Sequence, residues 1–129
     1  MTRICITGGP RTGKTTLAAS LGAGMPVTNC DDFIGMGWSE SSAHVATLLE
    51  RPGPWVIEGV QVARALRKWL AAHVPIVTDS RPCDRLIILR TPHVELTPGQ
   101  RSMAKGVDTV LAEILPALRA LGVEVEVGR

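Results

Sequence analysis

Short apolar runs alternate along the whole chain with segments that favour helix. β-branched and apolar residues gather in five runs, which predict strands over 3–7, 25–30, 55–60, 85–89 and 123–127. Helix-forming or helically periodic segments lie between the first four runs and after the fourth, and predict helices over 14–22, 41–51, 61–73 and from 98 onward. Strands that alternate with helices indicate an α/β fold, here a three-layer α/β/α domain with a five-stranded parallel sheet.

The last predicted helix and the last predicted strand carry clear local signals. Thr97, Pro98 and Gln100 form the pattern of a capping box with proline at the first helical position. Pro116 lies inside the same helix, and we expect it to kink the helix. The final run, VEVEV, alternates apolar and acidic residues, which is typical of a strand at the edge of a sheet.

Composition and charge narrow the class of protein. The chain has 129 residues, a length that predicts a single domain over residues 1–129. Its net charge of +2, without a basic run, argues against an extended nucleic-acid surface. Cys5, Cys30 and Cys83 are widely spaced and odd in number, so we expect free buried thiols in a reducing compartment rather than a zinc site.

The same features predict where the protein works. No apolar run approaches the roughly 20 residues that span a bilayer, and the first residues lack a signal-peptide pattern. We therefore expect a cytoplasmic protein with no membrane partner. The apolar stripes of the predicted helices are accounted for by an intramolecular core, so a monomer and a homodimer both remain open.

One loop carries the strongest chemical signal. Residues 8–15 read GGPRTGKT and match the phosphate-binding pattern G-x-x-x-x-G-K-[ST], directly after a predicted strand and at the start of a predicted helix. Glycines let successive backbone N–H groups surround an anion, and the helix adds the positive end of its dipole. We expect Lys14 to reach the β- and γ-phosphates of ATP, and the Thr15 hydroxyl to bind Mg²⁺. A glycine-rich turn with an incidental lysine is the alternative.

The expected nucleotide-binding residues share this loop and the first turn of the helix that follows it. They are Gly8, Gly9, Pro10, Arg11, Thr12, Gly13, Lys14, Thr15 and Thr16.

Charged residues also follow the other predicted strands. Asp31 and Asp32 come after the second strand, Glu58 ends the third, and Arg90 follows the fourth. In an open parallel sheet, ligands bind beyond the carboxyl ends of the strands, so we expect these groups to gather around the phosphate loop. One of the two aspartates should face a phosphate acceptor, while its neighbour caps a turn or reaches the metal's water shell. Arg90 is expected to stabilise the transferring phosphoryl group.

Three motifs together resemble a known family. GGPRTGKTTLA, DDF and VIEG are similar to the uridine kinase, nicotinamide riboside kinase and phosphoribulokinase branch of the P-loop kinases. The resemblance implies that Lys14 and Thr15 are the phosphate and Mg²⁺ residues and that Asp31 is the catalytic carboxylate. It also implies that Glu58 lies near the metal and the substrate, and we add Asp32 to the expected metal group.

The chain departs from that branch after its third strand. It is much shorter than most members, and the segment of about 90–105 is too short for an arginine-rich lid, so we expect only a short lid there. Arg101 and Lys105 lie opposite the apolar stripe of their helix, which favours a solvated face over a role in closing on ATP.

Three functions fit these features. The first is an ATP- and Mg²⁺-dependent kinase that transfers a phosphoryl group to a hydroxyl or phosphate of a small molecule, such as a nucleoside, a nucleotide or a similar metabolite. The second is a nucleotide-binding switch or regulatory ATPase without a small-molecule acceptor. The third is a kinase that acts on the 5′ end of a polynucleotide, against which the low net charge counts.

Overall fold

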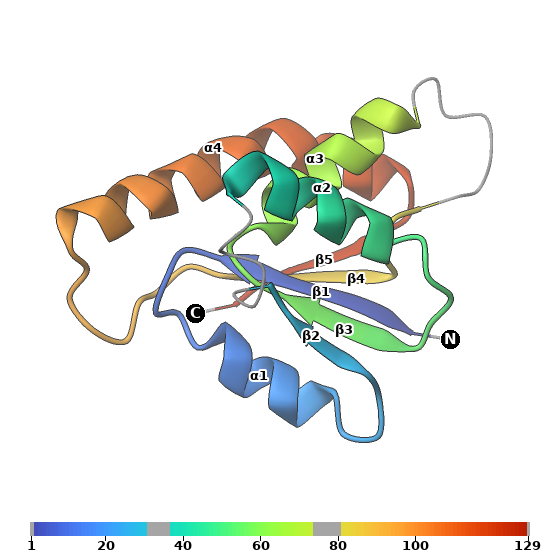
Figure 1. Cartoon of the computed structure of the whole chain (residues 1–129), viewed down its shortest axis with the longest axis horizontal. Coiled ribbons are helices and arrows are strands. Elements are labelled where there is room, and N and C mark those ends of the chain that lie inside the picture. Colours follow the sequence, from blue (N-terminus) through green and yellow to red (C-terminus); the bar gives the residue numbers. More distant parts are fainter. Residues whose placement is uncertain (1, 31–36, 74–80, 129) are drawn as a thin grey trace.

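The computed structural model describes residues 2–30, 37–73 and 81–128. These residues form one five-stranded sheet in which every pair of neighbouring strands is parallel, in the order β2-β3-β1-β4-β5 (Figure 1). The strands are β1 (Arg3–Gly8), β2 (Val27–Asn29), β3 (Trp55–Glu58), β4 (Arg85–Leu89) and β5 (Glu124–Val127). The helices are α1 (Lys14–Leu21), α2 (Trp38–Leu48), α3 (Val62–Ala72) and α4 (Pro98–Ala120).

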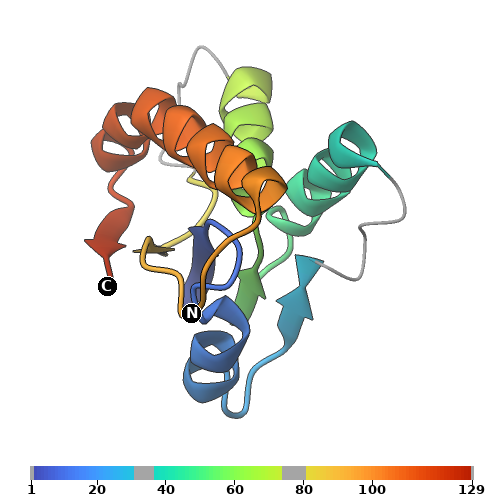
Figure 2. The same ribbon diagram turned by 90° about the vertical axis from the view of Figure 1, so that its left-hand side faces the viewer.

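The helices cover both faces of the sheet. In Figures 1 and 2, α1 lies against one face, while α2, α3 and α4 lie against the other. This arrangement follows from right-handed crossovers. The connection after β1 runs toward the β2 edge of the sheet, whereas the connections after β2, β3 and β4 run toward the β5 edge, so α1 lies on one face and the other three helices lie on the opposite face. The predicted α/β class and parallel sheet are confirmed, and the arrangement is compatible with three layers. β5 lies at an edge of the sheet, as its alternating sequence predicts.

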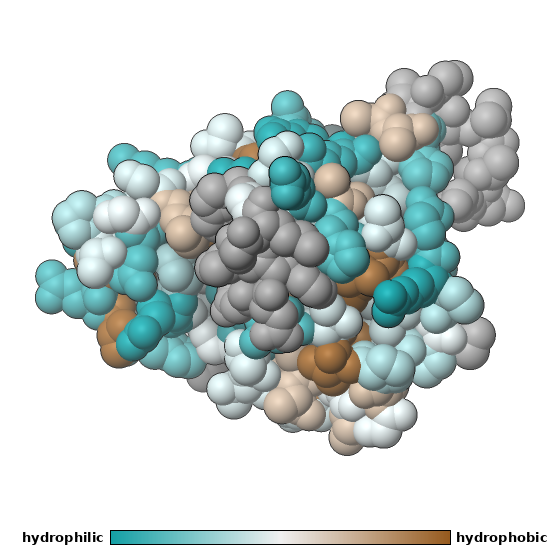
Figure 3. All heavy atoms as spheres, viewed as in Figure 1, coloured by the Kyte–Doolittle hydropathy of each residue, from teal (hydrophilic) through white to brown (hydrophobic). Residues whose placement is uncertain are grey.

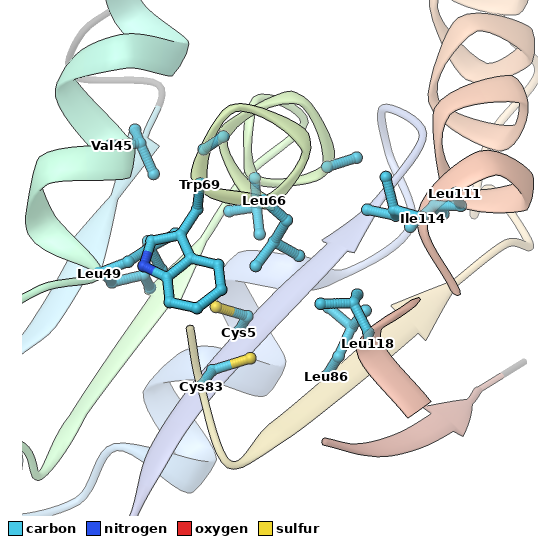
Figure 4. Close-up of a cluster of buried hydrophobic side chains, with 14 of the residues drawn as sticks. Cys5, Val45, Leu49, Leu66, Trp69, Cys83, Leu86, Leu111, Ile114 and Leu118 are labelled. Atoms are coloured by element: carbon cyan, nitrogen blue, oxygen red, sulfur yellow. The ribbon is translucent and has the colours of Figure 1, made fainter. Parts of the chain in front are cut away.

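The larger part of the core lies between the sheet and helices α2, α3 and α4. The buried residues of α4 recur every three or four positions and face this core: Val107, Val110, Leu111, Ile114 and Leu118. Figure 4 shows several of these side chains together with Leu86 of β4 and Trp69 of α3. A smaller cluster under α1 contains Ile4, Ile6, Ala18, Val56 and Ile87. Each fully buried aliphatic side chain of this kind contributes about 1.5–3 kcal/mol to folding before entropy is counted.

The three cysteines are free and buried, as expected. The hydrogen bond with the Cys83 side chain, followed by burial, raises the pKa of the Cys5 thiol well above its usual value. A thiol held in its neutral form is a poor nucleophile, so this pair serves as packing.

The start of α4 follows the sequence prediction. The Thr97 side chain accepts a hydrogen bond from the Gln100 backbone N–H at 3.2 Å, and the Gln100 side chain accepts one from the Thr97 N–H at 3.0 Å. Pro98 occupies the first turn, where its missing N–H costs nothing. Pro116 lies inside this 23-residue helix, which continues past it to Ala120.

The predicted bounds of the second helix are wrong by three residues at each end. The helix runs over Trp38–Leu48 instead of 41–51. It starts directly after Gly37, whose φ of 86° is a conformation that favours glycine, and Glu40 complements the dipole in the first turn. It ends early because Pro52 disfavours a helical conformation for Arg51. The chain leaves α2 through a turn in which the Arg51 N–H donates to the Leu48 carbonyl oxygen, three residues back.

The described surface is mixed in character. On the face shown in Figure 3, hydrophilic and hydrophobic residues are interspersed. The large hydrophobic residues exposed in the described ranges are Val27, Val94 and Val127, which lie on different elements or loops. Across those ranges, none of the helices is both long and apolar enough to traverse a bilayer.

Candidate functional site

The glycine-rich loop occupies the centre of the sheet's carboxyl edge. It joins β1 to α1, and β1 pairs with β3 on one side and β4 on the other. The connection that leaves β1 runs toward β2, whereas the one that leaves β4 runs toward β5. Strands whose connections diverge in this way open a crevice at their carboxyl ends, which is where open α/β sheets bind ligands.

Two glycines are required by the way the loop packs. A Cβ atom on Gly8 would lie 2.0 Å from the carbonyl oxygen of Leu89 in β4. Gly13 has a φ of 88°, and a Cβ there would lie 2.7 Å from Cε1 of the His93 ring. Arg11 also has a positive φ, 62°, so the loop turns sharply before α1 begins. Neighbouring elements therefore fix the loop's course as much as its own residues do.

Lys14 lies across the interior of the loop. Its Nζ donates to the carbonyl oxygen of Gly9 at 2.6 Å and lies 3.4 Å from Oγ1 of Thr12. The Thr12 hydroxyl donates to the same Gly9 carbonyl at 3.0 Å. The Lys14 residue is only 8% exposed, so its charge is held close to the backbone of the loop rather than extended into solvent.

The beginning of α1 is chemically suited to an anion. Its cap residue, Gly13, makes no side-chain capping hydrogen bond, and the first turn contains no acidic residue. The first N–H groups of a helix lack intrahelical partners and carry the positive end of the helix dipole. With the ammonium of Lys14 beside them, they form a site that favours a multiply charged anion such as a phosphate chain.

A carboxylate lies at the edge of this anion site. The hydroxyl of Thr15 is 3.4 Å from both carboxylate oxygens of Glu58, the last residue of β3. Glu58 is 1% exposed. Hydroxyl and carboxylate oxygens are the ligand types that Mg²⁺ takes from proteins, so this pair fits the metal that the sequence predicts. No cluster of three potential His, Cys, Asp or Glu ligands occurs among the described residues.

A pocket of about 440 Å³ opens beside the loop. Its lining includes Pro10, Arg11, Thr12, Gly13, Lys14, Thr15 and Thr16, together with Val60, Gln61, Gln100 and Met103. The last four come from two other parts of the chain, the turn after β3 and the first turns of α4. A Cβ on Gly9 would lie 2.8 Å from Cβ of Ala104, so α4 packs directly against the loop. The first turns of α4 thus form one wall of the pocket.

Sequence reasoning missed most of these walls. The sequence pattern indicates only a capping role for Gln100 and only the start of a helix at Gln61, and it gives no role to Met103. A usable signal existed: Val60 and Gln61 follow Glu58 at the carboxyl end of a central strand, where ligand-binding residues are expected. The contribution of α4 had no comparable signal, because it depends on how far that helix extends over the edge of the sheet.

The segment after β4 is fastened to the loop. The backbone N–H of His93 donates to the carbonyl oxygen of Arg11 at 2.7 Å, and the His93 ring lies beside Gly13. His93 is exposed and belongs to the irregular segment between β4 and α4, and no sequence motif indicates its contact with the glycine-rich loop. Arg90 is exposed and does not line the pocket.

The remaining predicted residues fall into two groups. Asp31 and Asp32 lie outside the described residues, and Cys30 directly before them is fully buried. Arg101 and Lys105 are exposed, which agrees with the predicted solvated face, and the Arg101 guanidinium donates to the Leu96 carbonyl oxygen at 2.8 Å. The segment 90–105, where the sequence predicts a short lid, divides into an irregular stretch and the first turns of α4.

These features define a class: an α/β protein with a parallel sheet, a glycine-rich loop after the central strand, and a lysine and a threonine at the start of the following helix. Comparison with protein-family models gives no match, and none of the curated proteins is similar enough to count as a relative.

Proposed function

We propose that the protein is an ATP- and Mg²⁺-dependent kinase of the P-loop type that phosphorylates a small molecule. The observation that carries the proposal is the position of Lys14, held inside the glycine-rich loop at the uncapped start of α1 and lining a pocket of about 440 Å³. A loop that served only as a tight turn would need neither the buried ammonium nor the pocket beside it.

The residues of the loop have distinct roles in this proposal. The backbone N–H groups and Lys14 bind the β- and γ-phosphates and neutralise charge that shifts during transfer. Thr15 and Glu58 are the described residues that would hold Mg²⁺, directly or through its water shell. The metal would supply positive charge that offsets the negative charge of the phosphates. Arg90 is exposed after β4. We propose that its guanidinium reaches the phosphates when the nucleotide is bound.

Transfer itself requires one more group. An acceptor hydroxyl oxygen forms a bond to the γ-phosphorus, and the bond to the β,γ-bridging oxygen breaks, releasing ADP. The hydroxyl proton passes to a carboxylate, a role that we assign to Asp31 on the strength of the family resemblance and its position after β2. Asp32 is assigned to the water shell of the metal on the same basis.

The pocket favours a kinase over a switch. A nucleotide switch needs only the phosphate loop and elements that respond to the γ-phosphate, whereas this pocket extends beyond the loop to Val60, Gln61, Gln100 and Met103. That space is suited to a second, small substrate next to the terminal phosphate.

The test is ADP release from Mg·ATP, measured with and without a panel of hydroxyl-bearing metabolites and an oligonucleotide with a free 5′-hydroxyl. A small-molecule kinase predicts release that depends on one of the metabolites. Release without any acceptor would support a regulatory ATPase, and dependence on the oligonucleotide would support a polynucleotide kinase.

Two variants separate binding from transfer. Lys14→Ala should weaken ATP binding at least 10-fold, since it removes a charge held against the phosphates. Asp31→Asn should leave ATP binding within 2-fold while abolishing transfer. Lys68→Ala removes the same charge from α3 outside the pocket and serves as the control. Full transfer activity in Asp31→Asn would refute the role given to that aspartate.

A further inference from the structure

We propose that Gln100 is a phosphate-binding residue whose side-chain amide has two tasks. Its Oε1 caps α4, and its Nε2 group donates to a phosphate oxygen of the bound nucleotide, so that nucleotide binding stabilises the start of α4. The inference rests on the proposed function, since a nucleotide is the ligand. Gln100 lies outside the motifs that resemble a known family, and those motifs supply no residue for this role.

The first turns of α4 lie against the glycine-rich loop. A Cβ on Gly9 would lie 2.8 Å from Cβ and 3.3 Å from Cα of Ala104, so the two segments are in close contact. Gln100 precedes Ala104 by four residues, which places it on the same face of the helix, one turn of about 5.4 Å nearer the start. Gln100 and Lys14 both line the pocket of about 440 Å³. The Gln100 side chain therefore borders the space that a phosphate chain held by the loop would occupy.

The capping box fixes the orientation of the Gln100 amide. Its Oε1 accepts a hydrogen bond from the Thr97 N–H at 3.0 Å, and a backbone N–H can pair only with the oxygen end of an amide. The Nε2 group is therefore the other end, and it makes no hydrogen bond to any of the residues that the structure describes. Gln100 is half-buried, so this group is open to a ligand in the pocket.

The surroundings of the amide favour an anion. The charged residues that line the pocket are cationic, Arg11 and Lys14, and the N–H groups at the start of α1 add to their effect. The first turn of α4 contains no acidic residue. An amide that has only its NH₂ group left to offer thus lies beside positive charges. Oxygens of a phosphate chain can accept from this donor and pair with the cations at the same time.

The two tasks of Gln100 couple the nucleotide to the helix. A side chain that is bonded both to a phosphate oxygen and to the Thr97 N–H holds the ligand and the first turn of α4 together. Coupling of this kind is reciprocal, so a ligand that binds Gln100 also strengthens the cap. We therefore expect the backbone amides of the first turns of α4 to exchange their hydrogens more slowly when the nucleotide is bound.

The first experiment separates the donor from the cap. Gln100→Glu keeps an oxygen for the Thr97 N–H, because glutamate is the other residue typical of a capping box, but replaces the NH₂ group with a carboxylate oxygen that repels phosphate. We expect the Kd for a non-hydrolysable ATP analogue with Mg²⁺, measured by calorimetry, to rise at least 10-fold. The urea midpoint should stay at or above that of the unaltered protein.

Three further variants serve as comparisons. Ser102→Glu adds the same charge to the same turn of α4 at an exposed position that does not line the pocket, and should raise the Kd less than 3-fold. Gln100→Met removes the donor and the cap without adding charge, and should raise the Kd about 10-fold. Thr97→Ala weakens the cap but keeps the amide, so it should lower the urea midpoint while the Kd changes less than 3-fold.

The possible outcomes are distinct. Equal values of Kd in Gln100→Glu and Ser102→Glu overturn the inference, and so does equal weakening of binding in Gln100→Met and Thr97→Ala. If the unaltered protein does not bind the ATP analogue, the proposed function is wrong. If the unaltered protein binds the analogue and Gln100→Glu binds it equally well, the proposed function stands and the role of Gln100 is wrong.

The second experiment tests the coupling by hydrogen exchange with mass spectrometry. In the unaltered protein, saturation with Mg²⁺ and the ATP analogue should slow exchange at least 10-fold in a peptide that covers residues 98–105. Gln100→Glu at saturating analogue should show less than a 3-fold change in the same peptide. A peptide from the other end of α4, residues 110–120, is the control within each protein. Equal slowing at residues 98–105 in the two proteins would contradict the coupling through Gln100.

Discussion

The backbone N–H of His93 donates a 2.7 Å hydrogen bond to the carbonyl oxygen of Arg11, which fastens the segment after β4 to the loop after β1. The imidazole ring then lies so close to Gly13 that a side chain on that glycine would meet it. The glycine-rich loop is therefore held by the segment after β4 as well as by its own hydrogen bonds, which makes Gly13 sensitive to substitution.

Gly13→Ala should weaken ATP binding at least 10-fold. Alanine at a φ of 88° is strained by about 1–2 kcal/mol, and its Cβ would lie 2.7 Å from the His93 ring, so the loop must shift. Gly24→Ala is the control, since Gly24 has a similar φ of 81° with no atom within 4 Å of a new Cβ. We expect Gly24→Ala to lower the free energy of unfolding by a similar strain while ATP affinity, measured by calorimetry, stays unchanged. Equal losses of ATP affinity in the two variants would show that the His93 contact is irrelevant.

Glu58→Gln should separate metal binding from nucleotide binding. Glu58 lies 3.4 Å from the Thr15 hydroxyl through both oxygens, and the amide removes the negative charge that favours Mg²⁺. We expect the Mg²⁺ concentration needed for half-maximal ATP binding to rise about 10-fold, with little change in metal-free binding. The measurement is an Mg²⁺ titration of ATP-analogue binding, with Glu113→Gln on the exposed side of α4 as the control. If the Mg²⁺ dependence of binding is the same in Glu58→Gln as in the unaltered protein, Glu58 does not bind the metal.

Thr97→Ala should destabilise the wall of the pocket that α4 forms. The substitution removes the hydrogen bond from the Gln100 N–H and should cost about 1 kcal/mol of the free energy of unfolding. Urea denaturation measures this loss. Thr109→Ala, further along α4, removes an exposed side-chain bond to the Lys105 carbonyl and should cost less than about 0.5 kcal/mol. Equal losses of the free energy of unfolding in the two variants would mean that the capping box stabilises α4 no more than an exposed side-chain hydrogen bond does.

Asp84 should make stability depend on pH in the acidic range. Burial raises the pKa of Asp84, but hydrogen bonds and charge from Arg3, together with the charge of Arg81, outweigh burial and hold the pKa below its usual value. A carboxyl group with a lowered folded-state pKa stabilises the protein fully above its unfolded pKa of about 3.9. That contribution is lost as the pH falls through the lower folded-state pKa.

The corresponding variant is Asp84→Asn. We expect it to be less stable than the unaltered protein by about 1 kcal/mol at pH 7, with a difference that shrinks as the pH falls below about 4. Urea midpoints at a series of pH values measure this, and Asp108→Asn on the exposed side of α4 controls for the change in net charge. A difference that stayed constant with pH would rule out the ion pairs as its cause.

The sequence determined the local parts of this protein. Strands and helices follow the spacing of apolar residues, the start of α4 follows the capping pattern of Thr97 and Gln100, and the glycine-rich loop follows a motif of eight consecutive positions, GGPRTGKT. Such features depend on residues that are neighbours in the chain, so their backbone preferences and hydrogen bonds can be read directly. The bounds of α2 were harder to predict, because they depend on Gly37 and Pro52, which lie outside the apolar stripe of the helix.

Only the tertiary structure decided which distant residues share the site. Gln61 follows β3, His93 lies between β4 and α4, and Met103 lies in α4. Each reaches the site because β3 and β4 flank β1 and because α4 extends over the edge of the sheet. The strand order and the packing of Ala104 of α4 against Gly9 arise from burial of apolar surface summed over the whole chain. No short segment encodes that sum. For this reason the walls of the pocket could not be predicted, whereas the position of the glycine-rich loop between β1 and α1 could.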